Sequence, residues 1–345
     1  MPAADLFLLP YLHRVVAREN LSVAEARDAM LAILSGESST AQIAAFLVAL
    51  RMKGETPEEL LGFARAIREN VTRVDAGLDG EALLDTCGTG GSDGPATFNI
   101  STIAALVVAG AGVRVAKHGN RSFSSACGSA DVLEELGVNC KLDAVQCGQS
   151  IREVGIGFLF APVLHPAVKY AQPARQELKM RTVFNLLGPL VNPADASTQL
   201  IGASSPSAAR LMAEALTGLG PERAFVVNGS DGLDEVTLTG PTLVFEIQQD
   251  RLTQHEWTPS DFGLEPASSA ALEGGDRVMN AAIAKAVLKG EQGARRDIVL
   301  MNAAAALVVS GKAHSLLEGM RLAAEAIDSG AAQAKLRLLI EFTNS

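Results

Sequence analysis

Residues 85–102 read DTCGTGGSDGPATFNIST, and the interpretation of the whole chain starts from this stretch. It follows a short apolar run, contains Gly88, Gly90, Gly91 and Gly94, and leads into an Ala/Val-rich helical pattern. Glycines let backbone N–H groups approach a ligand closely, and the positive end of the following helix adds to their attraction for an anion. The stretch therefore indicates a loop for phosphate or pyrophosphate, although a flexible surface loop would show the same glycines.

The residues after the glycines favour the anion-binding interpretation. Asn99, Ser101 and Thr102 stand at the expected helix start, where they can cap the helix or hold phosphate and metal-bound water. The loop is no Walker A motif, because no Gly-Lys-Ser/Thr ends it, and it does not fit the GxGxxG pattern of dinucleotide-binding folds.

Composition limits the classes of function. The 345 residues are enough for two domains, and 48% hydrophobic with 20% charged residues predicts an ordered globular protein. A formal net charge of −10 disfavours partners such as nucleic acid or an anionic membrane, and no apolar run is long enough for a membrane span. The four cysteines have no metal-site spacing, so we expect reduced thiols and a cytoplasmic protein without a signal peptide.

The chain divides into two parts by pattern. Helical segments with strong start signals fill the first part; Ser22 with Glu25 and Thr56-Pro57 with Glu59 are examples. We expect a small helical domain over 1–76, completed by part of 161–193, whose spare apolar faces form a dimer surface.

From residue 77 onward, strand-like runs alternate with helical patterns. The runs ALLD, VRVA, IGFLFA, QLIGAS and AFVVNG predict strands, with helical patterns between them. This alternation predicts an α/β domain over 77–345 with a central, largely parallel sheet flanked by helices. Ligands of such sheets bind beyond the carboxyl ends of the strands.

Three more segments carry candidate chemistry. KHGNRSFSS (117–125) follows a predicted strand and contains cations and hydroxyls, so it forms either a phosphate-binding loop or an ordinary solvated surface. Within it, His118 could be a general base or a structural residue. Asp234 and Glu235 are adjacent acids in a loop, either Mg²⁺ ligands or surface charges. Arg175 could hold a substrate carboxylate or lie on an ordinary helix surface.

Taken together, these segments resemble the anthranilate phosphoribosyltransferase family over nearly the whole chain. The motifs are DTCGTGGSDGPATFNIST, VAKHGNRSFSSACGSADVLEELG, NGSDGLDEVTL and the segment 158–193. The resemblance implies transfer of the 5-phosphoribosyl group from phosphoribosyl pyrophosphate to anthranilate, a homodimer through the helical part, and two Mg²⁺ ions per subunit bound with substrate. No covalent enzyme nucleophile is implied, and Lys117 and Arg175 would support the reaction.

The same resemblance implies three sets of site residues. Mg²⁺ would be held by Ser101, Asp234 and Glu235. Anthranilate would be held by Gly88, Asn120 and Arg175, with His118, Pro162 and Tyr170 along its route. Phosphoribosyl pyrophosphate would be bound by Gly88, Gly91, Ser92, Asp93, Thr97, Asn99, Ser101, Thr102, Lys117, His118, Gly119, Asn120, Arg121, Ser122, Phe123, Ser124, Ser125 and Ser129.

One departure from the family pattern lies in the glycine loop. The family usually reads GTGGD, whereas here Ser92 precedes Asp93 and lengthens the loop by one residue. Either Ser92 occupies the usual place of the aspartate or Asp93 reaches it through a bulge. Two other functions stay open: a nucleoside phosphorylase of related fold, and a non-catalytic relative that binds nucleic acid.

Overall fold

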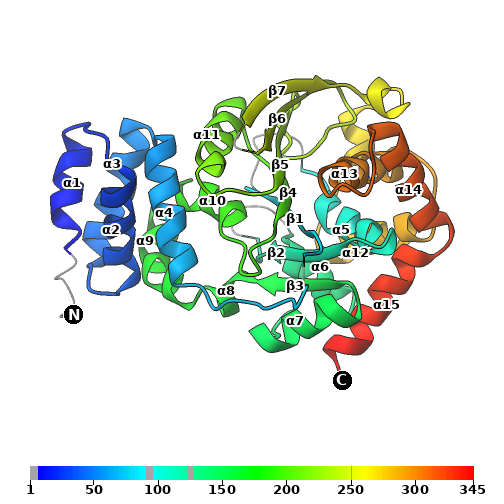
Figure 1. The fold of residues 1–345 in the computed structure, drawn as a ribbon, viewed down its shortest axis with the longest axis horizontal. Coiled ribbons are helices and arrows are strands. Elements are labelled where there is room, and N and C mark those ends of the chain that lie inside the picture. The colour runs from blue at the N-terminus through cyan, green and yellow to red at the C-terminus, as the bar shows by residue number, and fades with distance from the viewer. Residues whose placement is uncertain (1–6, 79, 91–95, 123–126, 250) are drawn as a thin grey trace.

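The computed structural model describes residues 7–78, 80–90, 96–122, 127–249 and 251–345. The N-terminal helices stand at one end of the molecule, and the C-terminal helices pack on the far side of a central sheet (Figure 1). This arrangement confirms the predicted helical part and α/β part with a mostly parallel sheet.

Local sequence signals begin the N-terminal helices where we expected them. The side chain of Ser22 accepts from the Glu25 N–H and that of Thr56 accepts from the Glu59 N–H, so both predicted capping boxes form. Gly54 follows α3 with a φ of 88°, a backbone conformation that favours glycine. The helices are α1 (Leu9–Val16), α2 (Val23–Leu34), α3 (Thr40–Lys53) and α4 (Pro57–Glu69).

A buried ion pair joins these helices. The Lys53 ammonium lies 2.9 Å from the Glu59 carboxylate, and both side chains are almost fully buried. The other Glu59 oxygen accepts the Leu21 N–H at 2.9 Å. Removing one partner of such a pair leaves an uncompensated buried charge, so the pair makes the fold of this part depend on both residues.

The chain returns to the helical part between β3 and β4. Here η1 contacts α2, α9 contacts α3, and α10 contacts α4. These contacts agree with the expectation that part of this segment completes the helical domain, which stays a prediction together with the domain limits. The elements are α8 (Ala161–Leu164), η1 (Pro166–Ala171), α9 (Gln172–Leu178), α10 (Phe184–Leu187) and η2 (Gly188–Leu190).

The described residues form one seven-stranded sheet of order β3-β2-β1-β4-β5-β6-β7. The first five strands in this order pair in parallel, so their carboxyl ends meet at one edge of the sheet. Strand β6 pairs antiparallel with β5 and with β7. The strands are β1 (Leu83–Gly88), β2 (Arg114–Gly119), β3 (Ile156–Phe160), β4 (Thr198–Gly202), β5 (Arg223–Gly229), β6 (Thr242–Gln248) and β7 (Arg251–Trp257).

Alternate side chains along a strand point to opposite faces of the sheet and pack into different hydrophobic cores. Phe225 and Val227 of β5 face the core shared with α5 and α13, while Ala224 and Val226 face the core shared with α11 and the helical part. Helix α11 therefore lies between the sheet and α4 (Figure 1). The helices of the first part of this domain are α5 (Ile100–Gly110), α6 (Ser129–Glu135), α7 (Ala144–Glu153) and α11 (Pro206–Thr217).

Helix α5, which leads to the site, is enclosed on most of its surface. Nearly all of its residues are buried, because α13, α14 and α15 cover the face turned away from the sheet. Among the described residues, no helix combines the length and apolar character that crossing a bilayer demands. The remaining elements are η3 (Pro259–Phe262), η4 (Ser269–Leu272), α12 (Arg277–Leu288), α13 (Ala294–Val309), α14 (Leu316–Asp328) and α15 (Ala331–Thr343).

Candidate functional site

A small pocket opens where the parallel strands end and α5 begins. Its walls come from the ends of β1, β4 and β5, the first turns of α5, one residue of α13 and the loop after β5. The first turn of a helix leaves backbone N–H groups without intrahelical partners, so this place attracts anions. The lining residues are Thr86, Cys87, Gly88, Ser101, Ala104, Leu200, Gly202, Val227, Asp234, Glu235 and Asn302.

Lys117 brings a buried cation to this place. It lies near the end of β2 and is only 3% exposed. Its ammonium donates to the Thr86 carbonyl at 2.6 Å and to Ser101 Oγ at 3.4 Å. Lys117, which we expected to follow the strand, lies within β2, because the strand continues to Gly119; its ammonium lies against the first turn of α5, where it can attract a phosphate group.

Asp234 and Glu235 reach the same place from the loop after β5. Asp234 Oδ2 accepts the Gly90 N–H at 2.8 Å, and Glu235 Oε1 accepts the Ser101 N–H at 3.1 Å. Burial raises the pKa of both carboxyl groups, and the negative charge of Asp234 raises the pKa of Glu235 further. Two half-buried carboxylates side by side repel each other, and a cation relieves this repulsion.

Glycine is required where this loop meets β1 and β4. A Cβ at Gly202 would lie 1.7 Å from the Asp234 carbonyl oxygen, and a Cβ at Gly88 would lie 2.5 Å from Asp234 Oδ2. Gly88, one of the predicted site residues, thus serves at least to let the carboxylate approach the strand. The donor set of Asp234, Glu235 and the Ser101 hydroxyl consists of hard oxygen ligands, so it fits Mg²⁺.

Of the other predicted residues around the start of α5, Asn99 and Thr97 have partners within the described part of the protein and the Thr102 hydroxyl has none there. Asn99 stands at the N-cap, but its side chain makes no capping hydrogen bond; it donates to the Cys127 carbonyl and accepts from Asn280. Thr97 forms an isolated bridge with Glu273. The hydroxyl of Thr102 is buried and has no hydrogen-bond partner among the described residues.

The loop after β2 is tied to α6. Arg121 forms ion pairs with Asp131 at 3.0 Å and Glu134 at 2.6 Å, so its charge is directed toward that helix. Ser129 Oγ donates to the Asn120 carbonyl, and a Cβ at Gly119 would lie 2.3 Å from that hydroxyl. The Ser122 N–H donates to Asp131. Their roles toward phosphoribosyl pyrophosphate stay predictions.

His118 is paired with a second buried histidine. Its Nδ1 lies 3.1 Å from the Gly188 carbonyl oxygen, which can only accept, so Nδ1 carries the proton. His118 Nε2 then accepts from His165 Nε2 at 3.1 Å. Burial lowers the pKa of His118 to about 3 and that of His165 to about 4. Because both nitrogens of His118 are engaged, the structure favours a positioning role over general-base catalysis.

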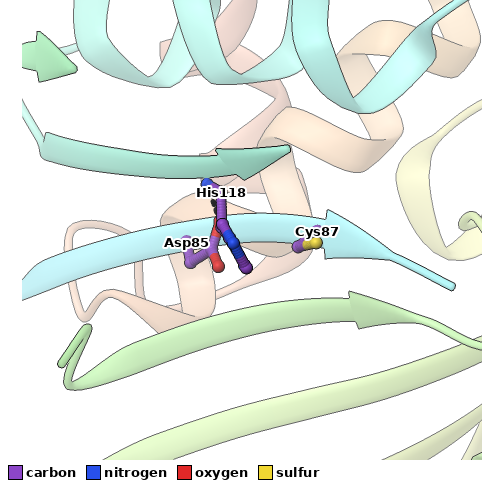
Figure 2. Close-up of side chains that lie close together, drawn as sticks. All are labelled: Asp85, Cys87 and His118. Carbon is purple, nitrogen blue, oxygen red and sulfur yellow. Dashed lines mark hydrogen bonds between the residues drawn. The ribbon is translucent and has the colours of Figure 1, made fainter. Parts of the chain in front are cut away.

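Asp85, Cys87 and His118 place potential metal ligands within 4.8 Å of one another (Figure 2). Each of these side chains already has a structural role or is held in a form that does not bind a metal. Asp85 accepts from the His118 N–H at 3.0 Å and from Asn192 at 2.7 Å, and both His118 nitrogens are engaged as above. Burial raises the pKa of the Cys87 thiol, so it stays protonated. The cluster is therefore a structural network that joins β1, β2 and the segment before β4.

Arg175 lies on α9, outside the cluster at the strand ends. Its guanidinium stands 5.1 Å from the Phe184 ring centroid, and Nη1 donates to Gln172. Pro162 is exposed on α8. The ring of Tyr170 faces Gly36, where a Cβ would lie 2.7 Å from it, so it contacts the end of α2. The predicted anthranilate roles of these residues stay predictions.

Sequence reasoning missed several residues that hold the site. Arg181 donates to the Gly90 carbonyl at 2.9 Å and joins the segment after α9 to the glycine loop. Nothing in the sequence around Arg181 indicates this contact, because the two residues are 91 positions apart. The sequence around Asp85 does carry an indication, since a carboxylate inside an apolar strand is unusual. Six predicted site residues lie outside the described part of the chain: Gly91, Ser92, Asp93, Phe123, Ser124 and Ser125. Which loop residue replaces the family aspartate therefore stays a prediction.

Comparison with known proteins gives matches over nearly the whole length of the chain. Residues 9–71 match the helical bundle domain of a glycosyl transferase family, and residues 80–333 match its a/b domain. The anthranilate phosphoribosyltransferase of Solibacter usitatus is 59% identical, with 98% of this chain and 99% of the relative covered.

Solved structures of anthranilate phosphoribosyltransferases also match this chain. The anthranilate phosphoribosyltransferase of Thermus thermophilus matches with a TM-score of 0.90 and 44% identity, over 97% of this chain and 99% of that one. The Saccharomyces cerevisiae enzyme in complex with phosphoribosyl pyrophosphate and Mg matches with a TM-score of 0.90 and 31% identity, over 99% of both chains. Its complex with 4-fluoroanthranilate matches with a TM-score of 0.87 and 30% identity, over 98% of this chain and 97% of that one.

Proposed function

The chain belongs to the anthranilate phosphoribosyltransferase family, and on that premise we propose that it transfers the 5-phosphoribosyl group of phosphoribosyl pyrophosphate to the amine of anthranilate. The bond between ribose C1 and pyrophosphate breaks, the bond between C1 and the amine nitrogen forms, and the amine loses a proton. The observation that carries the proposal is the convergence of Ser101, Lys117, Asp234 and Glu235 at the start of α5.

The pyrophosphate end of the substrate would lie against α5. The Lys117 ammonium is fixed before substrate arrives, because the Thr86 carbonyl and the Ser101 hydroxyl hold it. Fixed positive groups stabilise the negative charge that grows on the departing pyrophosphate, and they need no reorganisation during the reaction. The ribosyl carbon becomes more electrophilic as this charge is stabilised.

Asp234, Glu235 and the Ser101 hydroxyl are the residues that would hold Mg²⁺. We propose two ions per subunit, bound together with the substrate. When bound, Mg²⁺ supplies positive charge to the pyrophosphate oxygens. The two carboxylates supply the negative charge that would hold the ions. Their half-buried position lowers the local dielectric, which strengthens each electrostatic contact.

The anthranilate end would depend on orientation. Arg175 would hold the carboxylate through its planar guanidinium, with Gly88 and Asn120 against the substrate, and thereby direct the amine toward ribose C1. Such positioning contributes up to about 7–11 kcal/mol to a reaction barrier in favourable cases. An aromatic amine has a free electron pair, so it can attack without a base; the engaged nitrogens of His118 agree with this.

The test is the loss of anthranilate fluorescence after phosphoribosyl pyrophosphate and Mg²⁺ are added. We expect the native protein to consume anthranilate and the double variant Asp234→Asn/Glu235→Gln to consume almost none. Glu325→Gln, which removes an exposed carboxylate on α14, is the matched control and should keep full activity. Unchanged fluorescence with the native protein would refute the proposal. Cleavage of thymidine by phosphate, or retention of single-stranded DNA on a filter, would support the other two functions.

We propose further that the protein is a homodimer assembled through a helical domain of residues 1–76 and part of 161–193. Apolar side chains support this surface: Phe7 is 62% exposed, Val16 63% and Met52 70%, and α1 and α3 contact each other. Val16→Glu should give a monomer in light scattering, and a native monomer would contradict the proposal. We also place the protein in the cytoplasm, because its four cysteines are free thiols.

A further inference from the structure

Asn302 of α13 holds the loop that carries Asp234 and Glu235. Its Oδ1 accepts the Val236 N–H at 2.9 Å, and its Nδ2 donates to the Val236 carbonyl at 2.9 Å. Nδ2 also donates to the Ile298 carbonyl at 2.9 Å within α13. Asn302 is 1% exposed and lines the pocket beside Glu235. One amide therefore binds both backbone polar groups of the residue that directly follows Glu235.

Asp231 holds the same loop from its other side. Its Oδ2 accepts the hydroxyls of Thr237 and Thr239, both at 2.6 Å, and its Oδ1 accepts the Leu233 N–H at 3.1 Å. A carboxylate with three hydrogen bonds inside its own loop has both of its oxygens engaged there. Of the acidic residues in SDGLDE, the first thus shapes the loop and the other two face the pocket.

These bonds matter because the carboxylates of Asp234 and Glu235 repel each other. Adjacent half-buried negative charges lower their energy by moving apart or toward water. The clamp on Val236 and the bonds of Asp231 restrain the backbone on both sides of the pair. A loop that is already in its binding geometry loses less conformational freedom when a cation binds, so the cation binds more tightly.

We propose that Asn302 and Asp231 are positioning residues that preorganise Asp234 and Glu235 for a divalent cation. The inference rests on the proposed function, since it assumes that these carboxylates hold the metal. Neither positioning residue needs to touch the ion. Each acts through the backbone of the loop, as the outer partners of metal ligands do in other sites.

The experiment measures Mn²⁺ binding by electron paramagnetic resonance, with pyrophosphate present and no turnover. Asn302→Leu keeps the side-chain volume and removes both bonds to Val236, and Asp231→Ala removes the loop bonds. We expect each to raise the apparent dissociation constant for Mn²⁺ by about 10- to 100-fold. Asn302→Ser can keep one bond to Val236 and should show a smaller increase; it also replaces Asn302→Leu if that variant does not fold.

Ala306→Gly is the matched control, because it destabilises the same helix at a fully buried position and removes a methyl group that makes no hydrogen bond to the loop. Its Mn²⁺ affinity should equal that of the native protein even though it melts earlier. Unchanged Mn²⁺ affinity in Asn302→Leu and Asp231→Ala, together with loss of binding in Asp234→Asn/Glu235→Gln, overturns the inference alone. Equal binding by the native protein and that double variant overturns the proposed metal role itself.

Discussion

The free energy of unfolding should fall less in mild acid when His165 is replaced with glutamine. His165 and His118 form a buried pair that is neutral, because burial lowers the pKa of both groups. A glutamine amide can still donate to His118 Nε2, but it does not titrate. The variant therefore removes one buried titrating group and keeps the hydrogen bond.

The sign follows from the two states of the chain. An unfolded histidine takes up a proton near pH 6.5, whereas the folded values are about 3 for His118 and about 4 for His165. The stability from this pair is complete above pH 6.5 and is lost as the pH falls. Between about pH 7.5 and pH 5, each histidine removes about 2 kcal/mol from the free energy of unfolding.

Other buried groups act in the opposite direction. Burial raises the pKa of Asp85 to about 6, so the folded protein takes up this proton more readily and gains stability as the pH falls through that range. The carboxyl groups of Asp234 and Glu235 act in the same direction. The native protein and the variant share these groups, so their effects cancel when the two proteins are compared.

The assay is urea unfolding at both pH values, followed by fluorescence of Trp257, the one tryptophan of the chain. We expect the decrease in unfolding free energy to be about 2 kcal/mol smaller in His165→Gln than in the native protein. His314→Gln, which changes an exposed histidine, should match the native decrease. Equal decreases in the native protein and His165→Gln would refute the buried neutral pair.

Three further substitutions test other parts of the structure. Glu59→Ala leaves the Lys53 ammonium buried without its partner and should lower the free energy of unfolding by about 3–5 kcal/mol in urea titration; a loss below 1 kcal/mol would contradict the buried pair. Gly202→Ala should displace the Asp234 loop and nearly abolish turnover, whereas Gly188→Ala, with open space around its Cβ, should remain active. Arg175→Ala should mainly raise the KM for anthranilate in steady-state kinetics, and an unchanged KM would remove Arg175 from carboxylate binding.

Much of the site was predictable from local sequence. The glycines of 85–102, the helix after them, Lys117 and the pair Asp234–Glu235 all stand just after predicted strands, and parallel strands bring such positions to one edge. The side-chain partners of other residues were not predictable, and the roles of these residues toward phosphoribosyl pyrophosphate stay predictions. Asn99 stands at the N-cap without capping, and Arg121 is paired with acids of α6, because neighbours distant in sequence compete for these groups.

The sequence alone determined the elements whose causes lie within a few residues: the capping boxes at Ser22 and Thr56, the helix α5 after the glycine loop, and the alternation of strands and helices. Tertiary structure decided the antiparallel strands β6 and β7 at the sheet edge and the contacts that give side chains their chemistry. His165 meets His118 across 47 positions, Asn192 meets Asp85 across 107, and Glu235 meets Ser101 across 134. Such contacts depend on the path of the whole chain, because burial and a distant partner set the protonation and the orientation of a polar group.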